Sequence, residues 1–148
     1  MALMTSSFRK LQNITGKAHC SKKKEDLACY AYDATAQSYI PDAVLFPRNA
    51  EEISAVLKLA NKDGFFVIPR GSGTGMTGGS LAVKGGVILV MSRLNRILGI
   101  DKDNLIAHAE PGVVTGRFHR AVEKEGLFYP PEPASSDFST LGGNLAEC

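Results

Sequence analysis

The chain has 148 residues, a formal net charge of +2, 44% hydrophobic residues and 22% charged residues. These values are typical of a single globular domain, and so small a charge excludes a surface built to bind nucleic acid. No apolar run approaches the roughly 18 residues of a membrane span, and the first residues lack the pattern of a signal peptide. Cys20, Cys29 and Cys148 fit no CxxC spacing, which predicts free thiols in a reducing, cytoplasmic compartment and no metal site.

Residues 1–40 are expected to form an N-terminal extension made of helix and loop. The spacing of apolar residues predicts a short helix over Ser7–Thr15, and Gly16 stands where a C-cap glycine would. Weak periodicity from Lys17 to Ile40 predicts mostly loop. The apolar run Ala43–Phe46 then predicts a buried strand at the start of a second region, residues 41–148.

The strongest helical pattern follows Asn49. Asn49 can cap the helix, and Glu52 lies three residues further on, as in a capping box. Gly64 ends the helix. Apolar residues recur at helical spacing between them: Ile53, Val56, Leu57 and Ala60. Phe65–Ile68 predicts a second strand, which a βαβ connection would place parallel to the first.

Three further strands are predicted after a glycine-rich segment. They cover Val87–Met91, Arg96–Asp101 and Leu105–Ala109, with a hairpin turn at Asp101–Asn104. A second amphipathic helix is expected over Thr115–Glu125. The order βαβ, then three strands, then a helix predicts an α+β fold rather than a strictly alternating α/β fold.

The glycine-rich segment, Pro69–Gly79, holds five glycines within nine positions directly after a predicted strand. We call it the glycine loop. Glycine adopts positive φ and has no Cβ, so such a loop can point several N–H groups into one concavity that suits phosphate. Arg70 could add a charge there, and Ser72, Thr74 and Thr77 could add hydroxyl donors.

Two familiar phosphate motifs overlap this loop without their required context. Gly73–Gly78 matches G-x-G-x-x-G, but a Rossmann site needs a helix to begin inside the motif, and here a strand follows. The same residues begin a P-loop pattern, but Gly79 stands in place of the essential lysine. A flexible linker would not account for the apolar strands on both sides of the loop.

Six motifs in one order indicate a family. They are Pro69-Arg70-Gly71-x-Gly73-Thr74, Gly85-Gly86-Val87, Arg93-Leu94-Asn95-Arg96-Ile97, Ala109-Glu110-Pro111-Gly112-Val113, Tyr129 to Ser135 and Thr140-Leu141-Gly142-Gly143-Asn144. From about Pro41 to Cys148 the chain resembles the FAD-binding PCMH-type domain of the vanillyl-alcohol oxidase and p-cresol methylhydroxylase superfamily. Within it, the likeness is to the glycolate oxidase D-subunit and D-lactate dehydrogenase branch.

The resemblance implies two α+β subdomains with FAD between them. It assigns the pyrophosphate to the glycine loop through Pro69, Arg70, Gly71, Ser72, Gly73, Thr74, Gly75, Thr77 and Gly78. It assigns the flavin and ribityl side to Pro133, Ser135, Ser136, Thr140, Gly142, Gly143 and Asn144. Some members tether the flavin to a histidine in the glycine loop, and because this loop has none, the expected FAD is noncovalent.

The resemblance also implies what lies outside this chain. The chain is expected to be an N-terminal fragment, truncated within its FAD-binding domain, so no catalytic residue and no metal ligand is assigned to it. A 2-hydroxy acid substrate would be held by the missing C-terminal domain, and an iron–sulfur or other electron-acceptor subunit could bring the protein to the inner membrane. The fragment could also self-associate through unpaired strand edges.

The function implied is that of the FAD-binding portion of a flavin-dependent 2-hydroxyacid dehydrogenase of the glycolate or D-lactate type. Two alternatives stay open at this point. One is a nucleotide-binding fragment without catalysis, and the other is an FAD oxidase of another alcohol or sugar substrate.

Overall fold

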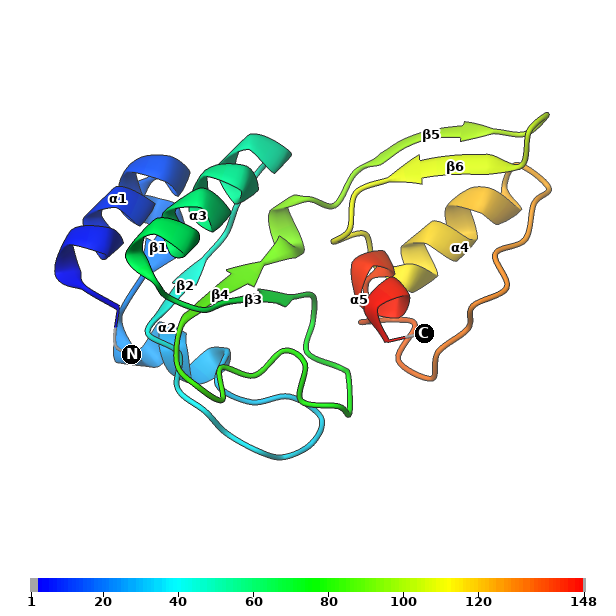
Figure 1. Ribbon diagram of the computed structural model, residues 1–148. Helices are drawn as coiled ribbons and strands as arrows, with labels where there is room; N and C mark the ends of the chain where they lie inside the picture. The colour runs from blue at the N-terminus through cyan, green and yellow to red at the C-terminus, as the bar shows by residue number, and fades with distance from the viewer. Residues whose placement is uncertain (1–2, 148) are drawn as a thin grey trace.

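The computed structural model describes residues 3–147, and the chain forms two lobes (Figure 1). The first lobe holds a four-stranded sheet of β1 (Cys20–Ser21), β2 (Ala43–Leu45), β4 (Val87–Val90) and β3 (Val67–Arg70), in the order β1-β2-β4-β3. Strands β2 and β3 each pair in parallel with β4, and β1 pairs antiparallel with β2. The parallel arrangement predicted for the two strands of the βαβ unit is confirmed, with β4 inserted between them.

Helices cover both faces of this sheet. The helices α1 (Thr5–Thr15) and α3 (Ala50–Asp63) lie on one face, where Leu11 and Val56 pack against β2 and β4. Helix α2 (Lys24–Cys29) lies on the other face, where Leu27 packs against alternate residues of the same strands. Since every residue of β2 and β4 is buried, these strands read in the sequence as continuous apolar runs.

The ends of α3 are as the sequence predicts. The Asn49 side chain accepts a hydrogen bond of 2.9 Å from the Glu52 amide, and the Glu52 carboxylate accepts one of 2.9 Å from the Arg48 amide. Gly64 closes the helix in the left-handed conformation, at φ +72°. Local sequence signals therefore set both boundaries of this helix.

Two predicted segments differ from the structure. Residues 17–40, expected to be mostly loop, contain the 3₁₀ turn η1 (Lys17–His19), β1 and α2. These elements are only two to six residues long, too short for a periodic pattern to show. The strand expected over Phe65–Ile68 instead begins at Val67, and the Phe66 side chain is 53% exposed.

The second lobe holds its own core. A 3₁₀ turn, η2 (Met91–Arg93), leads into the antiparallel hairpin of β5 (Ile97–Asp101) and β6 (Ile106–Ala109). Helix α4 (Thr115–Glu123) buries Phe118 and Val122 against this hairpin, beside Val113 and Leu141. A short helix, α5 (Leu141–Ala146), follows a long irregular segment. The α+β class predicted from the sequence is confirmed.

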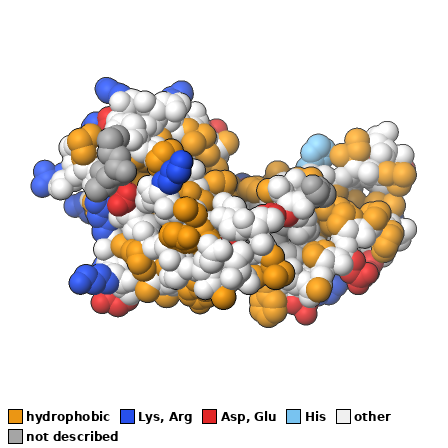
Figure 2. Space-filling view, turned by 60° about the horizontal axis from the view of Figure 1, so that its bottom comes forward, with side chains coloured by type: hydrophobic (Ala, Val, Ile, Leu, Met, Phe, Trp, Pro, Cys, Tyr) orange, Lys and Arg blue, Asp and Glu red, His pale blue; other side chains and the backbone are white. Residues whose placement is uncertain are grey.

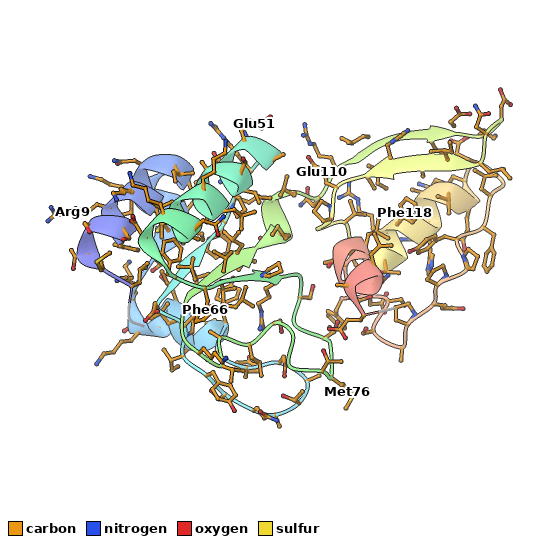
Figure 3. All side chains as sticks on the ribbon, in the orientation of Figure 1. Arg9, Glu51, Phe66, Met76, Glu110 and Phe118 are labelled. Atoms are coloured by element: carbon orange, nitrogen blue, oxygen red, sulfur yellow. The ribbon has the colours of Figure 1, made fainter. Side chains whose placement is uncertain are left out.

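Glu110 marks the junction of the two lobes, where it fastens the start of the hairpin (Figure 3). Its carboxylate accepts hydrogen bonds from the Arg96 amide (2.8 Å) and from the Arg96 guanidinium (2.7 and 3.1 Å). These hydrogen bonds and the charge of Arg96 lower the pKa of Glu110, although burial opposes the shift.

None of the helices among residues 3–147 combines the length and apolar character of a membrane span.

Candidate functional site

A pocket of about 1210 Å³ lies between the glycine loop of the first lobe and residues 129–147 of the second. The space-filling view shows the two lobes side by side with a hollow between them (Figure 2). Pockets for small ligands usually measure about 300–1,000 Å³, so this one has room for a dinucleotide. We call residues 129–147 the C-terminal wall of the pocket.

The pocket brings together nearly all of the residues assigned from the sequence. The lining includes Pro69, Arg70, Gly71, Ser72, Gly73, Thr74, Gly75 and Thr77 from the glycine loop, and Pro133, Ser135, Thr140, Gly142, Gly143 and Asn144 from the C-terminal wall. Gly78 and Ser136 do not line it. The Gly78 carbonyl accepts a hydrogen bond from the Leu81 amide in a turn, and the Ser136 carbonyl accepts one from the Gly116 amide.

The amides of the glycine loop are the free donors of the pocket. Among residues 3–147, the amides from Ser72 to Gly78 donate no hydrogen bond to a backbone or side-chain acceptor. Gly73 and Gly78 adopt φ values of +75° and +76°, which turn the chain back on itself. Met76 marks the exposed tip of the loop (Figure 3). An anion is a suitable ligand for such a row of unpaired N–H groups.

Arg70 lies at the base of the loop and points into the protein. Its guanidinium donates hydrogen bonds to the Tyr32 carbonyl (2.7 Å) and to the Ser80 hydroxyl (3.3 Å), and the residue is only 5% exposed. The sequence suggested that Arg70 could offer its charge to phosphate. The structure adds a role that the sequence did not indicate, because both terminal nitrogens of Arg70 donate to other parts of the protein.

Two of the three predicted hydroxyl donors are also engaged, and they tie the loop to the opposite wall. Ser72 donates to the Phe138 carbonyl (2.5 Å), and Thr77 donates to the Glu147 carboxylate (2.8 and 3.0 Å). These hydrogen bonds join the glycine loop to the C-terminal wall across separations of 66 and 70 residues in the sequence.

Within the C-terminal wall, the first amides of α5 differ from those of the glycine loop because they are already paired. In α5 the Gly142 amide donates to the Pro111 carbonyl (2.8 Å), and the Gly143 amide donates to the Thr140 hydroxyl (3.4 Å). A Cβ on Gly142 would lie 2.8 Å from Pro111 Cβ, so this glycine allows close packing. The Asn144 side chain donates to the Thr115 hydroxyl (2.9 Å) and joins α5 to α4.

Charged side chains alone would not attract an anion to this pocket. Of the described lining residues, Asp33, Glu132 and Glu147 carry carboxylates, whereas Arg70 is the one cation. The attraction for phosphate must therefore come chiefly from the bare amides of the glycine loop. A diphosphate held there would place the rest of a dinucleotide along the C-terminal wall.

Sequence reasoning missed several lining residues. Asp33 belongs to the segment predicted as loop, and Tyr129 and Glu132 stood inside a recognised motif without an assigned role. Glu147 follows the last motif. None of these residues carries a local signal, because their positions result from folding of distant segments.

Among residues 3–147, no cluster of three His, Cys, Asp or Glu side chains could hold a metal ion.

Comparisons with known proteins agree with this geometry. Residues 41–148 match the family described as FAD binding domain. Glycolate oxidase subunit GlcD of Bacillus subtilis (strain 168) is 44% identical over 138 residues, which cover 93% of this chain and 29% of that protein. D-lactate dehydrogenase of Anaerostipes hadrus is 39% identical over 106 residues, which cover 72% of this chain and 22% of that protein. The chain thus spans less than a third of the length of these relatives.

Two solved structures show the same fold. Alkyldihydroxyacetonephosphate synthase superposes with a TM-score of 0.86 at 24% identity, over 99% of this chain and 32% of that one. p-Cresol methylhydroxylase superposes with a TM-score of 0.75 at 21% identity, over 97% of this chain and 30% of that one. The family match, the relatives and the fold all agree, and this chain belongs to the FAD-binding domain family, with FAD as its cofactor and the PCMH-type fold.

Proposed function

We propose that this chain is the cofactor-binding portion of a flavin-dependent 2-hydroxyacid dehydrogenase of the glycolate or D-lactate type. The observation that carries the proposal is the pocket between the lobes, which is lined on one side by the C-terminal wall and on the other by loop residues whose amides are unpaired, among them Ser72, Gly73 and Gly75. The names of the relatives, a glycolate oxidase subunit and a D-lactate dehydrogenase, support the substrate class.

The residues present fit FAD. The free loop amides supply donors for a diphosphate, and each hydrogen bond to a charged oxygen contributes about 1.5–3 kcal/mol. The pocket volume of about 1210 Å³ accommodates a dinucleotide along the C-terminal wall. When bound, FAD supplies a ring that accepts a hydride, which is the chemistry that oxidation of a hydroxy acid requires. The part of this chain is to bind and orient the cofactor, and we expect the binding to be noncovalent.

The hydroxy acid and any partner belong to the proposal for the whole protein. One relative is named a subunit, which supports a partner subunit that accepts electrons. Because this chain spans 29% of that relative's length, the groups that bind the substrate and take its proton are expected on the part of the protein that this chain does not include.

Titration of the 148-residue chain with FAD, FMN and ADP tests the cofactor. We expect weak FAD binding, with a Kd above about 1 μM, which corresponds to a binding free energy no more favourable than about −8 kcal/mol. FAD should bind more tightly than FMN, because only FAD spans the loop and the C-terminal wall. Equal affinities for ADP and FAD would instead support a nucleotide-binding fragment that makes no use of the flavin.

A chimera tests the activity. Residues 1–148 would replace the matching segment of the Bacillus subtilis glycolate oxidase subunit, and flavin bleaching by glycolate and by D-lactate would be measured. The proposal predicts a yellow protein that one of the two acids reduces. A chimera that unfolds cooperatively but carries no flavin would contradict it, and reduction only by an unrelated alcohol or sugar would favour the alternative oxidase.

A further inference from the structure

The base of the glycine loop is fastened to residues 30–35, which precede the part of the chain that matches the FAD-binding family. We propose that Asp33 is a positioning residue for the glycine loop. It holds the loop in the conformation that binds the nucleotide, through Ser80 and Arg70. The inference rests on the proposed function of the pocket and adds to it a residue outside the family match.

Arg70 and Ser80 lie at the two ends of the loop and contact each other. The Arg70 guanidinium donates to the Ser80 hydroxyl (3.3 Å) and reaches the Ser80 carbonyl at 3.5 Å. The same guanidinium donates to the Tyr32 carbonyl at 2.7 Å and lies 5.8 Å from the centre of the Tyr30 ring. The loop is therefore closed at its base, and that base is anchored to the N-terminal extension.

Asp33 completes this arrangement from the other side. It is buried, at 6% exposure, and its carboxylate accepts hydrogen bonds from the Thr35 amide (2.9 Å) and hydroxyl (2.5 Å). The Ser80 hydroxyl lies 3.5 Å from the second carboxylate oxygen. Burial raises the pKa of Asp33, but the Thr35 hydrogen bonds and the charge of Arg70 together lower it by more than burial raises it, so the net shift is downward.

The Asp33 charge also favours the charged form of the buried Arg70 side chain. Burial lowers the pKa of Arg70, and the carboxylate of Asp33 opposes that shift. The link between the two residues runs through the Ser80 hydroxyl, so loss of the Asp33 charge should weaken the hold on the buried guanidinium and favour its movement toward water. Arg70 would then leave the Tyr32 carbonyl and the base of the loop would open.

The shape of the bare amides depends on this guanidinium. A Cβ on Gly73 would lie 2.6 Å from Arg70 Cζ, so the loop curls closely around the side chain. A loop that is already closed at its base binds its ligand without a further cost in ordering. If Arg70 moved away, residues 71–79 would become ordered only on binding the nucleotide, and binding would carry that cost.

The competing explanation is that Asp33 acts directly on the ligand. Asp33 lines the pocket, so its charge could simply repel a diphosphate. In that case its removal would strengthen FAD binding. Glu132 provides a matched comparison, because it lines the same pocket, is exposed, and makes no hydrogen bond to the glycine loop among residues 3–147.

The experiment compares Asp33→Asn with Glu132→Gln in the 148-residue chain. Trypsin needs an arginine side chain that is free to leave the protein, so cleavage after Arg70 reports whether the base is open. Cleavage after the exposed Lys84 is the internal reference. We expect Asp33→Asn to raise cleavage after Arg70 relative to Lys84 and to weaken FAD binding about tenfold. Glu132→Gln should leave the cleavage ratio unchanged and should not weaken binding.

Two results would overturn the proposal: unchanged protection of Arg70 in Asp33→Asn, or an FAD affinity that rises in Asp33→Asn. Ser80→Ala is a second variant, for use if Asp33→Asn does not unfold cooperatively and is therefore not properly folded. It should also raise cleavage after Arg70 relative to Lys84. The double variant should be less than additive, because both changes open the same base. If wild-type chain binds no FAD, the proposed function fails, while the trypsin ratio still tests the base by itself.

Discussion

Gly71 of the glycine loop and Thr140 of the C-terminal wall lie in direct contact across the pocket. A Cβ on Gly71 would overlap Thr140 Oγ1 and would lie 3.4 Å from Thr140 Cβ. The same hydroxyl caps α5 by accepting the Gly143 amide. The contact between the two lobes and the start of α5 therefore depend on the same side chain.

Gly71→Ala is expected to push Thr140 away and to loosen the cap of α5. Overpacking of this kind costs about 1–3 kcal/mol of folding free energy, and FAD affinity should fall as the walls separate. Gly79→Ala is the control, because its Cβ would meet Glu147 and Thr77 only at 3.4 Å. Chemical denaturation and FAD titration would measure both effects. Equal behaviour of the two variants would contradict the importance of the Thr140 contact.

Gly73→Val is expected to weaken FAD binding by at least tenfold, about 1.4 kcal/mol. From the sequence alone the loss would come from crowding of the diphosphate. The structure gives a nearer cause, since the new side chain would displace the Arg70 guanidinium. Gly78→Ala has the same left-handed backbone but finds only Leu81 at 3.8 Å. It should lose about 1–2 kcal/mol of stability from its φ angle and keep most of its FAD affinity.

Glu110→Gln is expected to destabilise the second lobe at neutral pH. The pKa of Glu110 lies below its ordinary value of 4.5 in the folded chain, because the carboxylate accepts hydrogen bonds from Arg96. A lowered folded pKa stabilises the chain above the unfolded pKa, and this contribution is lost as the pH falls through the folded pKa. The melting temperature of Glu110→Gln should therefore lie a few degrees below wild type at pH 7 and approach it in acid.

The exposed Glu123 provides the control for this titration. Glu123→Gln should melt close to wild type at pH 7, because among residues 3–147 its carboxylate accepts no hydrogen bond from a side chain or an amide outside its helix. A Glu110→Gln variant whose deficit stayed constant from pH 7 down to acid would show that the ion pair with Arg96 does not set the pH dependence.

The thiols of Cys20 and Cys29 should differ in reactivity. Burial raises the pKa of Cys20 to about 12, against a smaller opposing effect of Lys22, whereas Cys29 is exposed. Only the thiolate reacts with iodoacetamide. In the native chain at pH 8, peptide mass spectrometry should find Cys29 labelled and Cys20 unmodified. Both should react in denaturant, and equally fast labelling in the native chain would contradict the burial of Cys20.

Local signals were enough to predict much of the first lobe. Asn49 and Gly64 mark the ends of α3 because capping needs only neighbouring residues. The apolar run at β4 marks a strand that is buried on both faces. The glycine loop was also visible, because closely spaced glycines after a strand have few other uses.

The remaining features depend on contacts between distant segments. Helix α5 was not predicted, because Gly142 and Gly143 disfavour a helix and contacts with residues outside it, such as the Thr140 cap and the packing on Pro111, hold it. The inward direction of Arg70 is set by Tyr32 and Ser80, which lie 38 and 10 positions away. No periodicity in the sequence reports such a pairing.

The separate cores of the two lobes have a consequence for how the protein melts. Leu45 and Val56 belong to one apolar cluster and Phe118 and Val122 to another, and the pocket lies between the two lobes that they stabilise. Without a ligand, each half can lose its structure at its own temperature. A dinucleotide in contact with both halves stabilises only the state in which both are folded, so saturation should merge two calorimetric transitions into one.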